Sequence, residues 1–174
     1  YTSQLEDMGP FVIRYPRGNG VMPDWKRPFK ALPIGKGRKL VEGEEVAIIT
    51  LGHIGNEAAK AIIELNTEGI YPAHYDIRIV KPIDEDFLHE VFQKFNKVIT
   101  VEDGVLPGGF GSAVLEFMSN NNYSAQVIRL GIPDEIVEHG EQTELWNICK
   151  YDAKSISGTC KKLVKTLPTH SQVG

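Results

Sequence analysis

Beyond residue 37, the chain alternates between short apolar runs and longer stretches in which apolar residues recur every three or four positions. The runs are rich in Val and Ile, which is typical of buried β-strands, and the recurring positions mark one face of an amphipathic helix. Strands are therefore expected at 38–41, 46–51, 71–77, 97–101 and 126–130. Helices are expected at 56–68, 109–118, 141–149 and 153–167. A further helix is expected to begin after the capping residue Asp84 and to extend to Phe95.

Strands that alternate with helices are joined by crossover connections, which produce a largely parallel sheet covered by helices on both faces. The first two strands differ, because only the segment Glu-Gly-Glu-Glu at 42–45 separates them, and this short glycine-containing segment predicts a hairpin. The sequence therefore predicts an α/β fold of three layers, α/β/α, with a mostly parallel five-stranded sheet and one antiparallel edge strand.

The first 36 residues follow another pattern. Residues 11–15 are β-branched and aromatic, and they predict one short strand that ends at Pro16. Residues 19–36 are rich in proline and glycine, and their isolated aromatics Trp25 and Phe29 favour an ordered linker that lies on a surface. The chain lacks an initiator Met and opens inside a polar segment, so we expect that it was cut from a longer protein.

Composition and charge exclude several classes of protein. With 19 Lys and Arg against 23 Asp and Glu, the net charge is −4, and no basic excess is present to bind a nucleic acid. No apolar run has the length of a membrane span, and the first residues have no signal-peptide pattern. Cys149 and Cys160 form neither a disulfide framework nor a four-ligand zinc site. We therefore expect a cytoplasmic protein without nucleic-acid or membrane partners.

Two glycine-bearing turns, 51–56 and 107–112, each connect a predicted strand to a predicted helix, where free N–H groups can bind a phosphate. The first turn lacks the spacing of a dinucleotide fingerprint, and the second lacks the lysine of a P-loop. Close packing of helix on strand is therefore the favoured interpretation of these glycines, and Ser112 in the second turn does not stand in a nucleophile motif.

The remaining titratable residues do not assemble a reaction centre. The histidines lack paired metal-ligand spacing, and Glu138 beside His139 is typical of an exposed loop. Glu102 and Asp103 end a predicted parallel strand, at the edge where α/β sheets place their sites, and anchoring of a loop or interface is their favoured role. From these patterns we expect no catalytic, cofactor-binding or metal-binding residue in this chain.

Arg14 and Arg17 bracket a rigid turn, Arg-Tyr-Pro-Arg-Gly, at the end of the predicted N-terminal strand. A guanidinium group binds phosphate in a bidentate manner, and the proline and glycine fix how Arg17 projects. An ion pair with one of the many acidic residues explains the same pattern equally well, so the residues alone leave both interpretations open.

Several segments resemble the carboxy-terminal part of the 1-deoxy-D-xylulose-5-phosphate synthases. These segments are 11–19, 32–37, 76–84, 100–112 and 130–134, and the likeness extends to about residue 167. The segments at 76–84 and 108–111 are also similar to transketolases and to the beta chains of 2-oxo acid dehydrogenases. Arg-Tyr-Pro-Arg-Gly at 14–18 and Leu-Pro-Ile-Gly-Lys-Gly at 32–37 favour the synthases.

The resemblance implies a homodimeric transferase that uses thiamine diphosphate and Mg²⁺ to decarboxylate pyruvate. The two-carbon fragment is joined to glyceraldehyde 3-phosphate, and the product feeds isoprenoid, thiamine and pyridoxal synthesis. By residue match, Arg17 contacts the phosphate of the acceptor, whereas no such role is carried over to Arg14. The transketolase C-terminal domain fold is implied for the main part of the chain.

The chain also departs from the family pattern. It lacks the Gly-Asp-Gly motif with its downstream Asn that holds Mg²⁺, and Glu102-Asp103-Gly104 does not replace it. We therefore expect an isolated fragment without activity, composed of the end of a pyrimidine-binding domain (1–16), a linker (17–37), the C-terminal domain (38–167) and a tail (168–174). The alternatives are a stand-alone anion-binding or dimerisation module, and a beta chain of a 2-oxo acid dehydrogenase.

Overall fold

The computed structural model describes residues 1–6, 9–10, 12, 20–21, 26 and 28–165. The chain divides into two compact units, Tyr1–Ile34 and Gly35–Gly174. In the first unit, a short 3-10 helix, η1 (Thr2–Gln4), follows Tyr1, and the ring of Tyr1 stacks on Phe29 with 5.8 Å between the ring centres. The Leu32 N–H donates to Thr2 Oγ1 at 2.9 Å. The predicted strand at 11–15, apart from Val12, and Trp25 lie outside the described residues.

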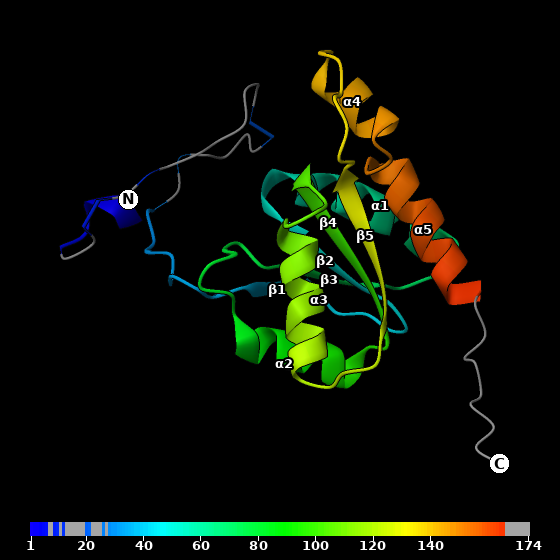
Figure 1. Ribbon diagram of the computed structural model, residues 1–174, viewed down its shortest axis with the longest axis horizontal. Helices are drawn as coiled ribbons and strands as arrows, with labels where there is room; N and C mark the ends of the chain where they lie inside the picture. Colours follow the sequence, from blue (N-terminus) through cyan, green and yellow to red (C-terminus); the bar gives the residue numbers. More distant parts are fainter. Residues whose placement is uncertain (7–8, 11, 13–19, 22–25, 27, 166–174) are drawn as a thin grey trace. The chain divides into compact units, whose positions relative to one another are not determined.

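The second unit contains a sheet of five strands in the order β1-β3-β2-β4-β5 (Figure 1). The strands are β1 (Arg38–Val41), β2 (Ala47–Leu51), β3 (Ala73–Asp76), β4 (Lys97–Val105) and β5 (Gln126–Ile132). The pairs β2/β3, β2/β4 and β4/β5 are parallel, whereas β1 pairs with β3 in the antiparallel direction. The predicted mostly parallel sheet with one antiparallel edge strand is confirmed.

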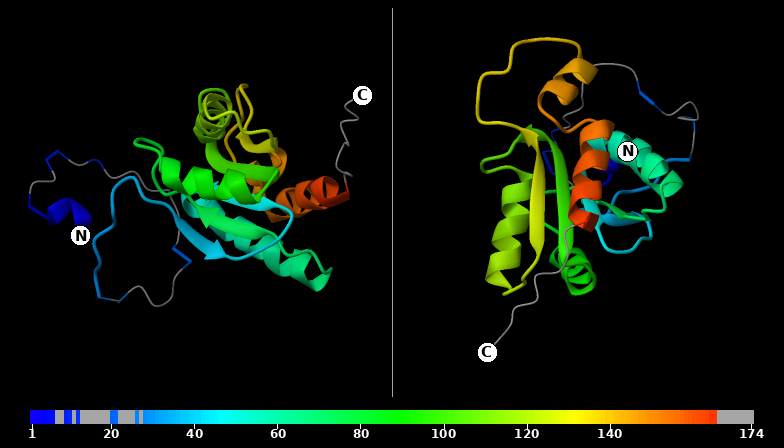
Figure 2. Two further views of the ribbon diagram at one scale, coloured as in Figure 1. Left: turned by 90° about the horizontal axis from the view of Figure 1, so that it is seen from below. Right: turned by 90° about the vertical axis from the view of Figure 1, so that its right-hand side faces the viewer.

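Helices cover both faces of this sheet (Figure 2). They are α1 (Gly55–Thr67), α2 (Glu85–Lys94), α3 (Phe110–Asn120), α4 (Gln142–Ile148) and α5 (Ala153–Lys165). Alternate residues of β2 belong to opposite layers: Ala47 and Ile49 pack with α2 and α3, whereas Ile48 packs with α1 and α5. The sheet therefore separates two apolar cores, as expected for a three-layer α/β/α fold. In the described part of the chain, no helix is long and apolar enough to cross a membrane.

The predicted hairpin between the first two strands is wrong, because β3 lies between β1 and β2. The connecting segment crosses the start of β3 instead, and the Glu44 N–H donates to the Tyr71 carbonyl at 2.7 Å. A Cβ atom at Gly43 would overlap the backbone of Pro72 and Ala73. The glycine that suggested a tight turn is therefore needed for close passage over a third strand.

The other elements predicted between residues 38 and 165 are confirmed, with shifted ends. The third strand is shorter than predicted, and β4 and β5 continue to Val105 and Ile132. Asp84 caps α2 by accepting a hydrogen bond from the Phe87 N–H at 3.4 Å. Gly69 follows α1 with a φ of 79°, the left-handed conformation that glycine adopts at low energetic cost after a helix.

Candidate functional site

The parallel strands β2, β3, β4 and β5 end at the same edge of the sheet, which is the carboxyl edge. In open α/β sheets this edge is the usual place for a ligand site. The 3-10 helix η2 (Gly52–Ile54) follows β2 there, residues 106–109 connect β4 to α3, and residues 133–141 connect β5 to α4. The polar side chains at this edge are therefore the first candidates for chemistry.

Glu102 is buried at this edge and caps the start of α3. Its Oε2 atom accepts a hydrogen bond from the Phe110 N–H at 2.7 Å, and its Oε1 atom accepts one from the Gly111 N–H at 2.8 Å. A Cβ atom at Gly109 would overlap this carboxylate, and one at Gly111 would lie too close to Thr100 and Arg129. The glycines therefore permit close packing, and a carboxylate occupies the position that a phosphate would take at this helix start.

A second set of hydrogen bonds holds the loop before α3. Arg129 Nη1 donates to the Leu106 carbonyl at 3.0 Å and to Ser112 Oγ at 2.8 Å. The Ser112 hydroxyl donates to the same carbonyl at 2.8 Å and accepts from the Gly108 N–H at 3.1 Å. Both polar side chains are thus used to fix the loop, which agrees with the absence of a nucleophile motif around Ser112.

Asp103, the next residue after Glu102, connects three elements at the edge. Its Oδ1 atom accepts a hydrogen bond from the Tyr151 hydroxyl at 2.8 Å, and its Oδ2 atom lies 3.0 Å from His53 Nε2. Burial and the hydrogen bond to Asp103 raise the pKa of Tyr151 well above its usual value, so the phenol stays protonated and donates. The His53 ring lies 5.7 Å from the Trp146 ring on α4. About a quarter of each of the Asp103 and His53 side chains is exposed.

The contact between His53 and Asp103 was not expected from the sequence, although the sequence contains a signal for it. His53 follows β2, Asp103 lies in the last part of β4, and the parallel register of these two strands places Leu51 opposite Glu102. Residues that follow neighbouring parallel strands emerge at the same edge. The expected anchoring role of Glu102 and Asp103 agrees with their contacts, since both hold segments that follow a strand.

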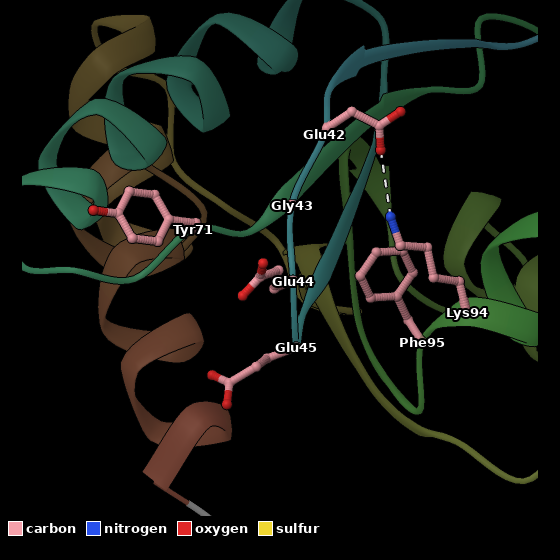
Figure 3. A pocket seen from close by; sticks show the side chains of 7 residues that line it. All are labelled: Glu42, Gly43, Glu44, Glu45, Tyr71, Lys94 and Phe95. Atoms are coloured by element: carbon pink, nitrogen blue, oxygen red, sulfur yellow. Dashed lines mark hydrogen bonds and ion pairs between the residues drawn. The ribbon is translucent and has the colours of Figure 1, made fainter.

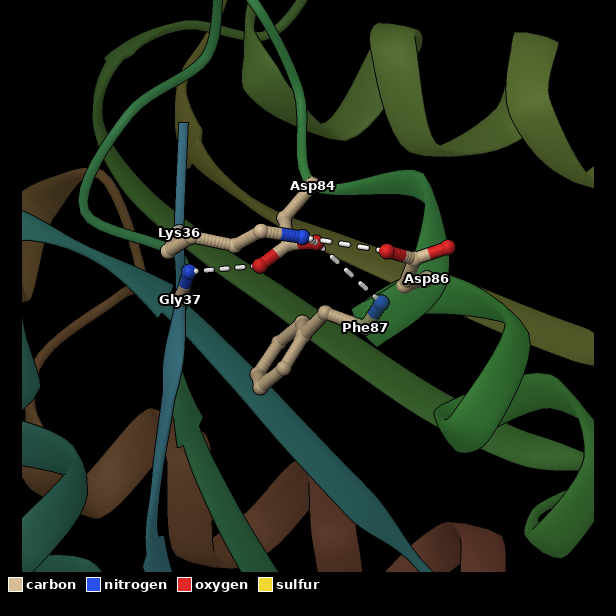
Figure 4. Close-up of polar contacts among 5 residues, drawn as sticks. All are labelled: Lys36, Gly37, Asp84, Asp86 and Phe87. Carbon is tan, nitrogen blue, oxygen red and sulfur yellow. Dashed lines mark hydrogen bonds and ion pairs between the residues drawn. The ribbon is translucent and has the colours of Figure 1, made fainter. Parts of the chain in front are cut away.

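Two of the segments that carry the family resemblance meet at Asp84 (Figure 4). Its carboxylate accepts hydrogen bonds from the Gly37 N–H at 2.9 Å and from Lys36 Nζ at 3.0 Å, in addition to capping α2. Burial opposes ionisation, but the hydrogen bonds from Gly37, Lys36 and Phe87 outweigh it and hold the pKa of Asp84 below its usual value. Lys36 also pairs with Asp86 at 3.1 Å. This set of contacts fixes where the domain begins and contains no reactive group.

A wide, shallow pocket of about 490 Å³ lies at the opposite edge of the sheet (Figure 3). The segment at 42–45, Tyr71, Lys94 and Phe95 line it. Lys94 is paired with Glu42 at 3.3 Å and lies over the Phe95 ring. The pocket contains no combination of base, nucleophile or metal ligands, and we assign no chemistry to it.

The remaining candidates in the described part of the chain do not come together. Arg14 and Arg17 lie outside the described residues. Glu138 and His139 are both exposed, and the described part of the chain shows no hydrogen bond between them. Burial raises the pKa of the Cys160 thiol to about 11, which makes it a poor nucleophile at neutral pH. Buried His74 donates to or accepts from Thr50 Oγ1 at 3.0 Å, inside the core.

The described residues do not fit a site for a diphosphate and its metal ion. They contain no group of three or more His, Cys, Asp or Glu residues placed to hold a metal. The α3 start, with its glycine-rich approach, is filled by the Glu102 carboxylate. We therefore derive no step of a cofactor reaction through these residues.

The sheet order and the covering helices define a three-layer α/β/α domain with a mostly parallel sheet. Residues 35–156 match the family model described as transketolase, C-terminal domain. The chain belongs to this family.

Curated relatives and solved structures agree with this classification. The chain is 63% identical over 164 residues to the 1-deoxy-D-xylulose-5-phosphate synthase of Cytophaga hutchinsonii. The aligned region covers 94% of this chain and 26% of the relative. It is 56% identical to the synthase of Phocaeicola vulgatus, covering 90% of this chain and 25% of that protein. The resemblance found in the sequence is thus confirmed, and the chain spans about a quarter of the length of these relatives.

Among solved structures, a split-gene transketolase, described as an inactive beta4 tetramer, matches with a TM-score of 0.69 and 31% identity. The match covers 78% of this chain and 44% of that one. A 2-oxoglutarate:ferredoxin oxidoreductase from Magnetococcus marinus matches with a TM-score of 0.52 and 19% identity, over 75% of this chain and 20% of that one. The second likeness concerns the fold alone.

Proposed function

We propose that this chain is the C-terminal domain of a 1-deoxy-D-xylulose-5-phosphate synthase. The whole enzyme would condense pyruvate with glyceraldehyde 3-phosphate to 1-deoxy-D-xylulose 5-phosphate and CO₂, using thiamine diphosphate and Mg²⁺. The observation that supports this most is the 63% identity to the Cytophaga hutchinsonii synthase over 94% of the chain. The segments at 14–18 and 32–37 are the part of the resemblance that favours the synthases over the other families with this domain.

Within that enzyme, we assign residues 1–16 to the end of the pyrimidine-binding domain, 17–37 to a linker, 38–167 to the C-terminal domain and 168–174 to a tail. Arg17 would contact the phosphate of glyceraldehyde 3-phosphate, and no cofactor would bind to this domain. The whole enzyme would be a cytoplasmic homodimer. The role of the C-terminal domain is then structural, because its carboxyl edge is built from capping and loop-fixing contacts.

The stand-alone anion-binding module is the weaker candidate. It requires a free helix start at 108–112, and the Glu102 carboxylate, which already accepts from both N–H groups there, argues against it. The alternative of a 2-oxo acid dehydrogenase beta chain is disfavoured by the Arg-Tyr-Pro-Arg-Gly and Leu-Pro-Ile-Gly-Lys-Gly segments.

The test of this function is an assay of the full-length gene product. With pyruvate, glyceraldehyde 3-phosphate, thiamine diphosphate and Mg²⁺, we expect formation of 1-deoxy-D-xylulose 5-phosphate and CO₂ in equal amounts. The 174-residue chain assayed alone under the same conditions should give no product. A full-length protein that decarboxylates pyruvate but forms no phosphorylated ketose, or turnover by the chain alone, would contradict the proposal.

A further inference from the structure

Residues 133–148 form a projection at the carboxyl edge of the domain. The projection consists of the segment that follows β5 and the helix α4, and it extends beyond the ends of β4 and β5 (Figures 1 and 2). It is anchored at its base, where Trp146 lies beside the His53 ring and Tyr151 donates to Asp103. A projection fixed in this way presents a defined surface to its surroundings.

The surface of the projection carries large apolar side chains that the domain does not cover. Ile136 is 98% exposed, the highest value of any large apolar side chain in the described residues, and Ile148 is 63% exposed. Single exposed apolar side chains are common on protein surfaces. Two such side chains on one anchored projection, Ile136 in the segment after β5 and Ile148 at the end of α4, suggest instead that another surface covers them.

Charge indicates what kind of surface this is. The projection carries five exposed acidic residues, Asp134, Glu135, Glu138, Glu141 and Glu144. The sequence contains no Lys or Arg between Arg129 and Lys150. Within the described residues, none of the five carboxylates forms an ion pair, whereas Glu42, Glu64 and Glu90 elsewhere pair with lysines. A partner that is apolar at its centre and carries Lys and Arg around it would complement this surface.

We propose that the projection docks onto a basic, apolar-centred surface in the part of the full-length protein that lies outside these 174 residues. The inference rests on the proposed function, since the relatives are about four times as long as this chain and most of their length lies outside the part that it matches. A symmetric contact between two copies of the projection itself is disfavoured, because it would place the five carboxylates of one copy against the same five of the other.

The test compares the reactivity of introduced thiols in the full-length protein. Ile136→Cys and, in a separate protein, Ile63→Cys are labelled with a maleimide, and peptide mass spectrometry follows each thiol separately. Ile63 on α1 is 69% exposed, so in the domain alone its side chain is less exposed than that of Ile136. If the projection is docked, Ile136→Cys should react at least about tenfold more slowly than Ile63→Cys, whereas both should react equally in denaturant. Ile148→Cys serves as a second probe should Ile136→Cys not fold.

Charge reversal tests the chemistry of the partner. Glu135→Lys with Glu138→Lys, added to Ile136→Cys, should raise its labelling rate to that of Ile63→Cys. The control pair Glu44→Lys with Glu45→Lys, also exposed but at the other edge, should leave the rate low. Equal labelling rates for the two cysteines before charge reversal would overturn the docking. This is also the result expected if the partner of the projection were a separate protein, which is absent from the preparation. If Ile136→Cys reacts slowly and charge reversal does not raise its labelling rate, the basic character of the partner is overturned.

The same preparations also separate this inference from the proposed function. Synthase activity with an unprotected Ile136→Cys means that the function holds and the docking fails. A slowly labelled Ile136→Cys in a protein without synthase activity means that the docking holds and the proposed function fails.

Discussion

The carboxylate of Glu102 accepts the backbone N–H of Gly111 at 2.8 Å, and its second oxygen accepts that of Phe110. This contact connects the end of β4 to the start of α3 through a single buried side chain. Because the first N–H groups of a helix have no partner within the helix, a carboxylate at this position satisfies them and interacts favourably with the helix dipole. The glycine-rich turn is therefore a structural connection in which the Glu102 carboxylate takes the place of a bound anion.

Glu102→Ala should destabilise the domain by about 3 kcal/mol, because it leaves two buried N–H groups without an acceptor. Glu102→Gln retains one acceptor and should lose less. Urea unfolding followed by circular dichroism measures both changes. The control is Glu116→Gln, an exposed carboxylate on the same helix, which should change the free energy of unfolding by less than about 0.5 kcal/mol. Equal stability of Glu102→Ala and Glu116→Gln would contradict the capping role.

Tyr151→Phe should destabilise the domain by about 1.5 kcal/mol, because the Tyr151 hydroxyl donates to a charged carboxylate at 2.8 Å. Asp103→Asn and the double variant complete a double-mutant cycle, and we expect a coupling free energy of about 1 kcal/mol between the two side chains. Tyr71→Phe, at an exposed tyrosine, is the control. Strictly additive effects of Tyr151→Phe and Asp103→Asn would show that the hydrogen bond does not contribute to stability.

Acid should destabilise the domain through His74. Burial lowers the pKa of His74 to about 4, with the Asp76 carboxylate opposing this shift and the Arg38 guanidinium adding to it. The unfolded chain has a histidine pKa of about 6.5, so between these values it binds a proton that the folded chain does not. The stabilising effect is therefore complete above about pH 6.5 and is lost as the pH falls toward 4, by about 3 kcal/mol in total.

Comparison of the wild type with His74→Gln isolates this contribution from the titration of carboxylates. Urea unfolding at pH 7 and at pH 4.5 should show a smaller loss of stability for His74→Gln than for the wild type. His139→Gln, at an exposed histidine, should lose as much as the wild type. The assignment fails if His74→Gln and the wild type lose the same free energy between the two pH values.

Gly43→Ala should destabilise the domain by about 2 kcal/mol or more, because the new methyl group overlaps the backbone at Pro72 and Ala73, which must shift. Gly158→Ala is the matched control: Gly158 lies in α5 with open space around its Cβ position, so alanine there should stabilise the helix by about 0.5–1 kcal/mol. Thermal unfolding of the two variants should give melting temperatures that shift in opposite directions. A Gly43→Ala protein as stable as the wild type would contradict the crossing over β3.

The layers of the fold could be predicted because each element carries its own pattern. Apolar residues at three- and four-residue spacing mark α2, and the cap at Asp84 marks its start. The partner of β1 could not be predicted in this way. A short connection favours pairing with the next strand, but in the structure the segment at 42–45 packs over the start of β3, and β1 pairs with β3. Pairing between strands depends on contacts distant in the sequence, which a local pattern does not contain.

The candidate site shows the same limit. The packing role of Gly109 and Gly111 could be inferred, because the turn lacks the residues of a phosphate site. The capping of the helix start by Glu102 could not be inferred, because the contact joins residues eight positions apart, in a part of β4 where the pairing register with β5 shifts between Val101 and Val105. Parallel strand ends do predict that residues such as His53 and Asp103 emerge at one edge.

In the full-length protein, Arg17→Ala should lower kcat/KM for glyceraldehyde 3-phosphate by about 10- to 150-fold. Loss of a charge-assisted hydrogen bond to the phosphate removes about 1.5–3 kcal/mol of binding to the transition state, which corresponds to that range. Arg17→Lys keeps the charge but not the bidentate geometry, so it should recover part of the loss. Lys30→Ala, at an exposed lysine in the same unit, is the control and should leave kcat/KM unchanged.

The assignment of Arg17 to the acceptor predicts a specific separation of the two half-reactions. In the proposed reaction pyruvate carries no phosphate, so the rate of its decarboxylation measured without acceptor should be the same in Arg17→Ala and in the wild type. An unphosphorylated acceptor such as glyceraldehyde should be used equally by both proteins, because it has no phosphate for Arg17 to bind. If decarboxylation falls in Arg17→Ala while the use of glyceraldehyde 3-phosphate relative to glyceraldehyde is unchanged, Arg17 acts on the first half-reaction or on folding, and the phosphate contact is refuted.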